Sequence, residues 1–313
     1  MSFTAEVRDE LSRVEPRREC CAQAELSALI RFDGVLTIAA GGAYRLELVT
    51  ESAPVARTII GLAHNVAGLK TELTPRRNVL HKTNSYLITI PNQARLKPAL
   101  QTLGLFESGY ISGSIDTAVV RRDCCAISYL RGAFLGGGFV SDPQSDAHFE
   151  ITCRSEALAQ GLVALMTRFD LDAKYVARRS AWTVYLKGAE PILNFLALVG
   201  AHKALLKTEN VRVVKSMRND VNRRVNAEIA NQTKASKAAL SQLTTIRRLQ
   251  EAGALERLPK GLYQFAELRL AHPELSLREL GQAAIPPLSK SAVNHRMRRL
   301  EEAVRALDDA GKS

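Results

Sequence analysis

The segment 289–299 concentrates side chains that can hydrogen-bond to nucleic-acid bases and phosphates. At 100° per residue, Ser291, His295 and Arg298 fall on one face of a helix, flanked by Asn294 and Arg299. Arginine can bind guanine and asparagine can bind adenine through two hydrogen bonds, while lysine suits a phosphate contact. The pattern therefore predicts a base-reading helix, with these candidate contacts: Ser289, Lys290, Ser291, Asn294, His295, Arg296, Arg298 and Arg299.

The flanking sequence predicts that this helix is the second of a helix-turn-helix. Ser276 and Glu279 have the spacing of a capping box, which starts a short helix. The prolines of segment 285–288 make a turn, and Ser289 then caps a second helix over residues 290–307. Its inward apolar stripe is Val293, Met297, Leu300 and Val304. A basic helical hairpin on a protein surface is the alternative, but the base-reading residue types favour DNA.

A second set of residues resembles the LAGLIDADG motif of homing endonucleases. It occurs twice, as LSALIRFDG at 26–34 and LRGAFLGGG at 130–138. That resemblance implies two closely packed helices, each ending in an acid that holds a divalent metal ion beside the scissile phosphate. Asp33 stands at the first acid position, but Gly137 stands at the second and has no side chain to bind metal. We therefore predict a nuclease-like scaffold without catalytic residues or a metal site, in which Asp33 serves as a helix-end or turn residue.

Five cysteines form a third candidate group: Cys20, Cys21, Cys124, Cys125 and Cys153. Their number is odd, and no two of them have the CxxC spacing of a metal site. Adjacent cysteines on a helix point about 100° apart, so one pair does not easily bind one ion. We predict buried thiols in a reducing compartment, with no cofactor. A four-thiolate site assembled from both pairs is the alternative.

The cysteine pairs also head an internal repeat. The repeats span about 20–105 and 124–205. In each repeat the sequence pattern predicts a helix, strands, a helix, strands and a closing helix. The closing helix of the second copy is predicted over 191–205. The predicted fold class is α+β. A duplicated LAGLIDADG-like αββαββα domain over 1–205 is followed by a helical linker over 206–230 and an all-α helix-turn-helix domain over 231–313.

Composition and charge agree with two globular domains. The 313 residues are 46% hydrophobic and 24% charged, and no apolar run approaches the roughly 20 residues of a membrane span. We expect a cytoplasmic, nucleoid-associated protein. The net charge is +11; residues 1–202 hold 22 Lys and Arg against 20 Asp and Glu, whereas residues 203–313 hold 21 against 12. The basic last third favours a polyanionic partner.

Taken together, these parts resemble the WhiA family of bacterial transcription regulators. The resemblance rests on the two CCA-headed motifs, on NRRVNAEIAN at 222–231 and on LSKSAVNHR at 288–296. It implies a non-enzymatic, sequence-specific regulator that binds double-stranded DNA at promoters of cell-division and sporulation genes. It also implies a WhiB-type iron–sulfur protein and RNA polymerase as partners, and no membrane.

Two other functions are carried as alternatives. The scaffold supports an active LAGLIDADG-type DNA endonuclease, which Gly137 opposes. The near-neutral charge of residues 1–202 supports a protein-interaction module with secondary DNA contact. The basic stretches 76–82 and 174–179 could instead line a DNA-binding saddle.

Overall fold

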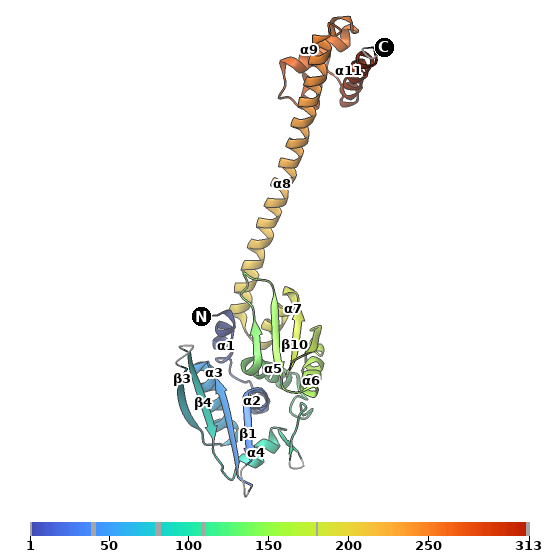
Figure 1. Ribbon diagram of the computed structural model, residues 1–313. Coiled ribbons are helices and arrows are strands. Elements are labelled where there is room, and N and C mark those ends of the chain that lie inside the picture. Colours follow the sequence, from blue (N-terminus) through green and yellow to red (C-terminus); the bar gives the residue numbers. More distant parts are fainter. Residues whose placement is uncertain (1, 39–41, 79–82, 108–109, 180, 311–313) are drawn as a thin grey trace. The chain divides into compact units, whose positions relative to one another are not determined.

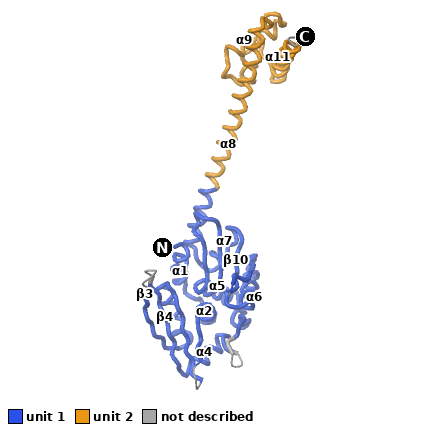
Figure 2. The backbone as a smooth tube through the Cα atoms, viewed as in Figure 1, with its two compact units in different colours: residues 1–215 blue, residues 216–313 orange. Residues whose placement is uncertain are grey.

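The computed structural model describes residues 2–38, 42–78, 83–107, 110–179 and 181–310. The chain divides into two compact units, unit 1 (residues 1–215) and unit 2 (residues 216–313) (Figure 2). Within the described ranges, no helix is both long enough and apolar enough to span a bilayer.

Unit 1 contains the same arrangement of elements twice, after a first helix α1 (Phe3–Leu11). The first copy consists of α2 (Glu19–Asp33), β1 (Gly34–Ile38), β2 (Tyr44–Thr50), α3 (Ala53–Ala67), β3 (Glu72–Asn78), β4 (Thr83–Ile90) and α4 (Leu96–Thr102). A ribbon of β5 (Phe106–Glu107) and β6 (Tyr110–Ile111) follows. The second copy consists of α5 (Asp123–Gly137), β7 (Gly138–Val140), β8 (His148–Cys153), α6 (Glu156–Thr167), β9 (Ala173–Arg178), β10 (Ala181–Lys187) and α7 (Ala189–Val199). The predicted αββαββα duplication is confirmed.

The two sheets have equivalent topologies. Their strand orders are β1-β2-β4-β3 and β7-β8-β10-β9, and all pairs are antiparallel. Along β2 and β8, side chains alternate between the core and the outer face, so that Leu46, Leu48, Phe149 and Ile151 are buried. The sequence pattern indicates strands at 44–50, 85–90, 148–153 and 181–186 and strand-like stretches at 76–82 and 174–179, which correspond to β2, β4, β8, β10, β3 and β9. β1 and β7 complete the two sheets.

The central helices α2 and α5 pack against each other at short range, with a sheet on each side (Figure 1). A Cβ added to Gly132 would lie 2.5 Å from the backbone oxygen of Glu25 and 2.9 Å from Cβ of Ala28. The two helices are closely packed, as the resemblance implies, and the absence of a side chain at Gly132 allows this approach. A buried ion pair adds a second link, because Arg131 Nη2 donates to Glu25 Oε2 over 2.9 Å.

The helix predicted over 191–205 is interrupted, and this expectation is wrong. α7 ends at Val199 because Gly200 adopts a left-handed conformation with φ of 97°. A new helix, α8 (His202–Glu251), starts two residues later and includes all of 206–230.

Unit 2 is entirely helical. Besides its part of α8, it contains the 3₁₀ turn η1 (Leu255–Arg257), α9 (Lys260–Ala271), α10 (Leu277–Ala283) and α11 (Lys290–Ala310). Its core joins Ile246 and Leu249 of α8 to Leu262 and Phe265 of α9 and to the predicted α11 stripe. All four stripe residues are buried: Val293, Met297, Leu300 and Val304.

Candidate nucleic-acid interface

The α10–α11 segment forms the helix-turn-helix that the sequence predicts. Ser276 Oγ accepts from the backbone N–H of Glu279 over 3.3 Å, and the Glu279 carboxylate accepts from the Ser276 N–H over 2.8 Å. Ser289 Oγ accepts from the Ala292 N–H over 3.2 Å at the start of α11. The turn is tight, because a Cβ on Gly281 would lie 2.6 Å from the Leu288 oxygen. These contacts fix the direction in which α11 leaves the turn.

Seven of the eight candidate DNA contacts are exposed on or beside α11: Ser289, Lys290, Ser291, Asn294, His295, Arg298 and Arg299. Among the described residues, Lys290, Arg298 and Arg299 have no carboxylate within ion-pair distance. The buried stripe holds the opposite side of the helix against the core. The exposed face therefore presents unneutralised donors that are positioned by a packed scaffold.

Arg296 differs from the other seven candidates, because it is half-buried. Its Nη2 lies 3.6 Å from the position that a Cβ on Gly261 would occupy, near the start of α9. The guanidinium thus lies against α9 rather than extending from the exposed face. Arg296 directly precedes the buried Met297, so its side chain leaves the helix beside the buried stripe rather than opposite it.

The ends of α2 and α5 in unit 1 carry the remnant of the LAGLIDADG motif. Asp33 is mostly buried between two guanidinium groups, those of Arg8 and Arg154. Arg8 Nη2 donates to the Gly138 oxygen over 2.8 Å, and Arg154 donates to the Gly34 oxygen. Burial raises the pKa of Asp33 to about 7, against the two arginine charges, which lower it. A buried carboxyl group with a raised pKa and two guanidinium charges nearby is a poor ligand for a divalent cation.

The second acid position leaves no space for a side chain. A Cβ on Gly137 would lie 2.9 Å from the backbone oxygen of Thr152 and 3.2 Å from Cδ1 of Phe32. A pair of metal-binding carboxylates is thus missing at the helix ends, and two arginines supply positive charge there instead. These residues do not fit the divalent ions that the nuclease motif implies.

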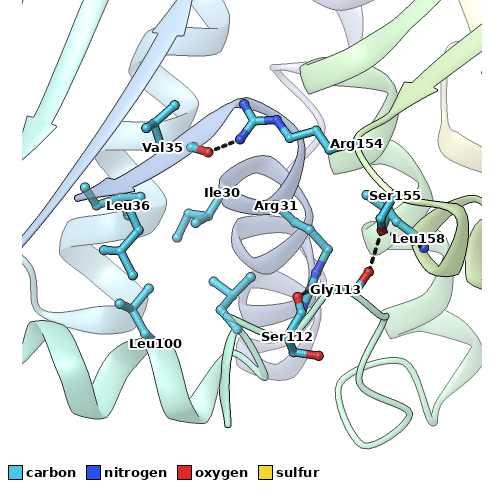
Figure 3. A pocket seen from close by; sticks show the side chains of 13 residues that line it. Ile30, Arg31, Val35, Leu36, Leu100, Ser112, Gly113, Arg154, Ser155 and Leu158 are labelled. Atoms are coloured by element: carbon cyan, nitrogen blue, oxygen red, sulfur yellow. Dashed lines mark hydrogen bonds between the residues drawn. The ribbon is translucent and has the colours of Figure 1, made fainter. Parts of the chain in front are cut away.

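A cavity of about 320 Å³ lies beside the C-terminal end of α2 (Figure 3). Its polar side chains are engaged with the backbone: Arg31 Nη2 donates to the Gly104 oxygen over 2.8 Å, and Ser155 Oγ donates to the Gly113 oxygen over 2.9 Å. The remaining walls are mainly aliphatic, including Ile30 and Leu158. No acid lines the cavity among the described residues, so it offers no second carboxylate to Asp33.

The outer faces of the two sheets are apolar and acidic at equivalent positions. Val35 is 53% exposed and pairs with Glu47, and Phe139 is 47% exposed and pairs with Glu150. Glu150 forms an ion pair with Arg178, with 2.9 Å between Oε1 and Nη1. Among the described residues, the edge strands β3 and β9 carry Arg76, Arg77, Lys174 and Arg178, and the inner strands β2 and β10 carry Arg45 and Lys187. Residues 79–82 of the stretch 76–82 lie outside the described residues. Arg45 pairs with Glu47 over 2.8 Å, so both central carboxylates are matched by an arginine. These faces therefore present little net charge to attract phosphates.

Sequence reasoning missed Arg8 and Arg154 as partners of Asp33. Arg8 binds the carbonyl group of Gly138, and Arg154 binds that of Gly34, each more than a hundred residues away in the chain. No local sequence pattern could therefore reveal where these arginines lie. Sequence reasoning also left the arrangement of the cysteines open. The Sγ atoms of Cys20, Cys21 and Cys125 lie within 4.8 Å of one another.

Comparison with known proteins gives full-length matches. Three family models match in succession: the WhiA N-terminal LAGLIDADG-like domain at 19–106, the WhiA LAGLIDADG-like domain at 126–218 and the WhiA C-terminal HTH domain at 221–304. The chain is 46% identical over 314 residues to a probable cell division protein WhiA of Desulfitobacterium hafniense (strain Y51), covering 100% of this chain and 98% of the relative. It is 46% identical over 313 residues to the corresponding protein of Heliobacterium modesticaldum, covering 99% and 98%.

Two solved structures have the same fold. Full-length WhiA from Thermatoga maritima matches with a TM-score of 0.62 at 24% identity, covering 97% of this chain and 99% of that one. The N-terminal LAGLIDADG domain of WhiA matches with a TM-score of 0.51 at 20% identity, covering 64% and 90%. A helix-turn-helix domain joined to a LAGLIDADG-like domain suggests DNA binding.

Proposed function

The chain belongs to the WhiA family, and from this premise we propose that it is a sequence-specific, non-enzymatic regulator of transcription. Its DNA targets are promoter regions of genes for cell division and sporulation, so it acts at the nucleoid. The relatives named above are called probable cell division proteins, which agrees with this target class. We retain residues 231–313 as the DNA-binding domain, 1–205 as the duplicated domain and 206–230 as the linker.

The exposed face of α11 is the observation that supports this proposal most directly. Ser291, His295 and Arg298 project opposite a buried stripe, and the capped turn before them holds the helix at a fixed angle. In a helix-turn-helix, the N-terminal part of the second helix contacts base edges. Glu301 and Glu302 follow on the same helix and would repel phosphates. We therefore assign base contacts to the first turns of α11 and phosphate contacts to Ser289 and Lys290.

We assign Arg296 a supporting role within this interface. Its half-buried side chain lies near Gly261 at the start of α9. From there it stabilises the position of α11 and adds positive charge near the DNA backbone, rather than reading a base.

The absence of nuclease activity is the second part of the proposal. The observation behind it is that Asp33 faces Arg8 and Arg154, while Gly137 has no room for a carboxylate. Phosphodiester hydrolysis of the two-metal type needs ions that stabilise both the attacking and the leaving oxygen. With a single carboxyl beside two guanidinium groups, we expect neither ion to bind there.

A separate observation favours a protein-binding role for unit 1. Val35 and Phe139 are large apolar side chains exposed at equivalent positions on the two sheets, each beside a glutamate. Such a mixture suits a protein surface better than a phosphate backbone. A WhiB-type iron–sulfur protein and RNA polymerase are the partners that we propose for this role.

A capture experiment tests the proposed function. Full-length protein is incubated with sheared genomic DNA in Mg²⁺ at physiological salt, and both the sequences and the ends of bound fragments are determined. We expect intact fragments that share a short motif upstream of genes. Fragments that end at a common position would contradict the non-enzymatic part, and the absence of any shared motif would contradict sequence-specific binding.

A further inference from the structure

The N-terminal ends of α2 and α5 bring together cysteines that are about a hundred residues apart in the chain. The Sγ atoms of Cys20, Cys21 and Cys125 all lie within 4.8 Å of one another. Cys124 lines the same hollow as Cys21, a cavity of about 340 Å³. Each repeat thus contributes two thiols, from the first turn of its central helix, to one group.

The spacing of these sulfurs is close to that of a metal–thiolate site. Zinc binds thiolates at about 2.3 Å in a tetrahedron, which places the sulfurs about 3.8 Å apart. The three sulfurs therefore need to move by only about 1 Å or less to surround an ion. Cys20 is half-buried, and the hollow beside Cys21 and Cys124 is open to solvent, so an ion has a route to the thiols.

Positive charge lies beside these thiols. They stand in the first turns of two helices, whose N-terminal ends carry a partial positive charge. Arg18 and Arg122 are the N-cap residues of these helices, and Arg122 Nη1 lies 3.6 Å from Cys20 Sγ. A zinc ion with four thiolates has a net charge of about −2, which these groups would offset.

The metal-free thiols differ in acidity. Burial is the main cause that raises the pKa of Cys21 and Cys125, whereas contact with Cys125 and with the Arg122 guanidinium lowers the pKa of Cys20.

We propose that Cys20, Cys21, Cys124 and Cys125 form a binding site for one soft divalent cation of the zinc type. The ion joins the two repeats at the start of their central helices, at the end opposite Asp33 and Gly137. The site is independent of DNA reading by α11, so it stands or falls separately from the proposed function.

Metal analysis of the full-length protein tests this site. Reduced protein is mixed with excess Zn²⁺ and separated from unbound ion by gel filtration. Its zinc content per chain is then measured by elemental mass spectrometry. We expect about one zinc ion per wild-type chain. The double variant Cys20→Ser/Cys125→Ser lacks one ligand from each helix. We expect its zinc content per chain to be about tenfold lower than that of wild type, or lower still. Cys153→Ala removes a buried thiol of β8 outside the group, so this matched control should retain zinc as wild type does.

A measurement on the wild type avoids any effect of the substitutions on folding. Reduced protein is alkylated with and without Zn²⁺, and each modified cysteine is located by peptide mass spectrometry. Zinc should slow modification of Cys20 and Cys124, the two half-buried thiols, by about tenfold or more. A Co²⁺ titration should give the intense absorption of tetrahedral cobalt–thiolate. The proposal would be overturned if zinc left the alkylation rates unchanged and wild type retained no zinc. Full zinc retention by the double variant, or a disulfide between these cysteines in place of a metal site, would also overturn it.

Discussion

The helix ends of unit 1 and the exposed face of α11 in unit 2 show opposite uses of charged side chains. In unit 1, Asp33 is mostly buried, and the arginines near it bind backbone carbonyl groups. In unit 2, Lys290 and Arg298 are exposed, and no carboxylate of the described residues pairs with them. Unit 1 thus has LAGLIDADG-like domains in which Asp33 has no second carboxylate at the Gly137 position. The comparison teaches that function is argued from the side chains a surface presents, rather than from the fold alone.

The largest effect that we predict concerns the pH dependence of stability at Asp33. Because burial raises its folded-state pKa from 3.8 to about 7, stability from this group is complete below about pH 4 and is lost as pH rises through about 7. The loss amounts to at most about 4 kcal/mol. Asp33→Asn removes this titration, so its free energy of unfolding relative to wild type should increase from pH 4 to pH 8.

Urea unfolding of both proteins across this pH range provides the measurement, since other groups titrate alike in both and cancel. Parallel pH profiles would mean that Asp33 is an ordinary exposed carboxylate. That result would weaken the contrast between the two units, because Asp33 would then be available to a metal ion.

The second prediction concerns the close contact of α2 with α5. Gly132→Ala places a Cβ 2.5 Å from a backbone oxygen, so we expect a loss of about 3 kcal/mol in the free energy of unfolding of unit 1. Gly61→Ala on α3 is the matched control: its Cβ meets nothing within 4 Å, and it should stabilise the helix by up to about 1 kcal/mol. Denaturant titration measures both, and equal effects would refute the close packing.

The third prediction concerns base reading by α11. Arg298→Ala should weaken binding to the specific site by about 1–3 kcal/mol and relax the preference at one base pair. Arg305→Ala is matched to it, because Arg305 is exposed on nearly the same face two turns later, beyond Glu301 and Glu302. Competition binding with single-base variants of the site should show no change for Arg305→Ala. Equal losses for both variants would indicate general electrostatic attraction.

The smallest effect that we predict concerns phosphate contacts. Lys290→Ala should weaken binding to all sequences alike and reduce the slope of log affinity against log salt by about one. Lys174→Ala, on the edge strand β9 of unit 1, should leave the slope unchanged. Binding measured at several salt concentrations tests both. A change for Lys174→Ala would place unit 1 on the DNA.

Local patterns in the sequence predict much of the fold and of the helix-turn-helix. The capping box of Ser276 and Glu279 and the stripe of Val293 and Met297 depend on spacings within one or two turns, and the structure confirms both. The repeat was visible because each copy starts with the same three residues. Gly200 was not recognised as a helix end, since the apolar pattern continues through it and only its left-handed backbone breaks the helix.

Contacts between the two repeats could not be predicted from the sequence. The placement of Arg8 and Arg154 near Asp33 depends on how the two repeats pack. The same is true of the cysteines: a single adjacent pair is poorly arranged for an ion, but two helix ends bring the sulfurs together. Arg296 was grouped with the base-reading residues because periodicity alone does not reveal that its side chain lies against α9.

One measurement tests most directly the claim that unit 2 rather than unit 1 reads DNA. Two full-length triple variants are compared in competition binding to the captured site and to random DNA: Ser291→Ala/Asn294→Ala/Arg298→Ala on α11, and Arg76→Ala/Arg77→Ala/Lys174→Ala on the sheet edges. We predict that the α11 variant loses the preference for the specific site and that the sheet-edge variant keeps it. Loss of the preference in the sheet-edge variant alone would contradict the account.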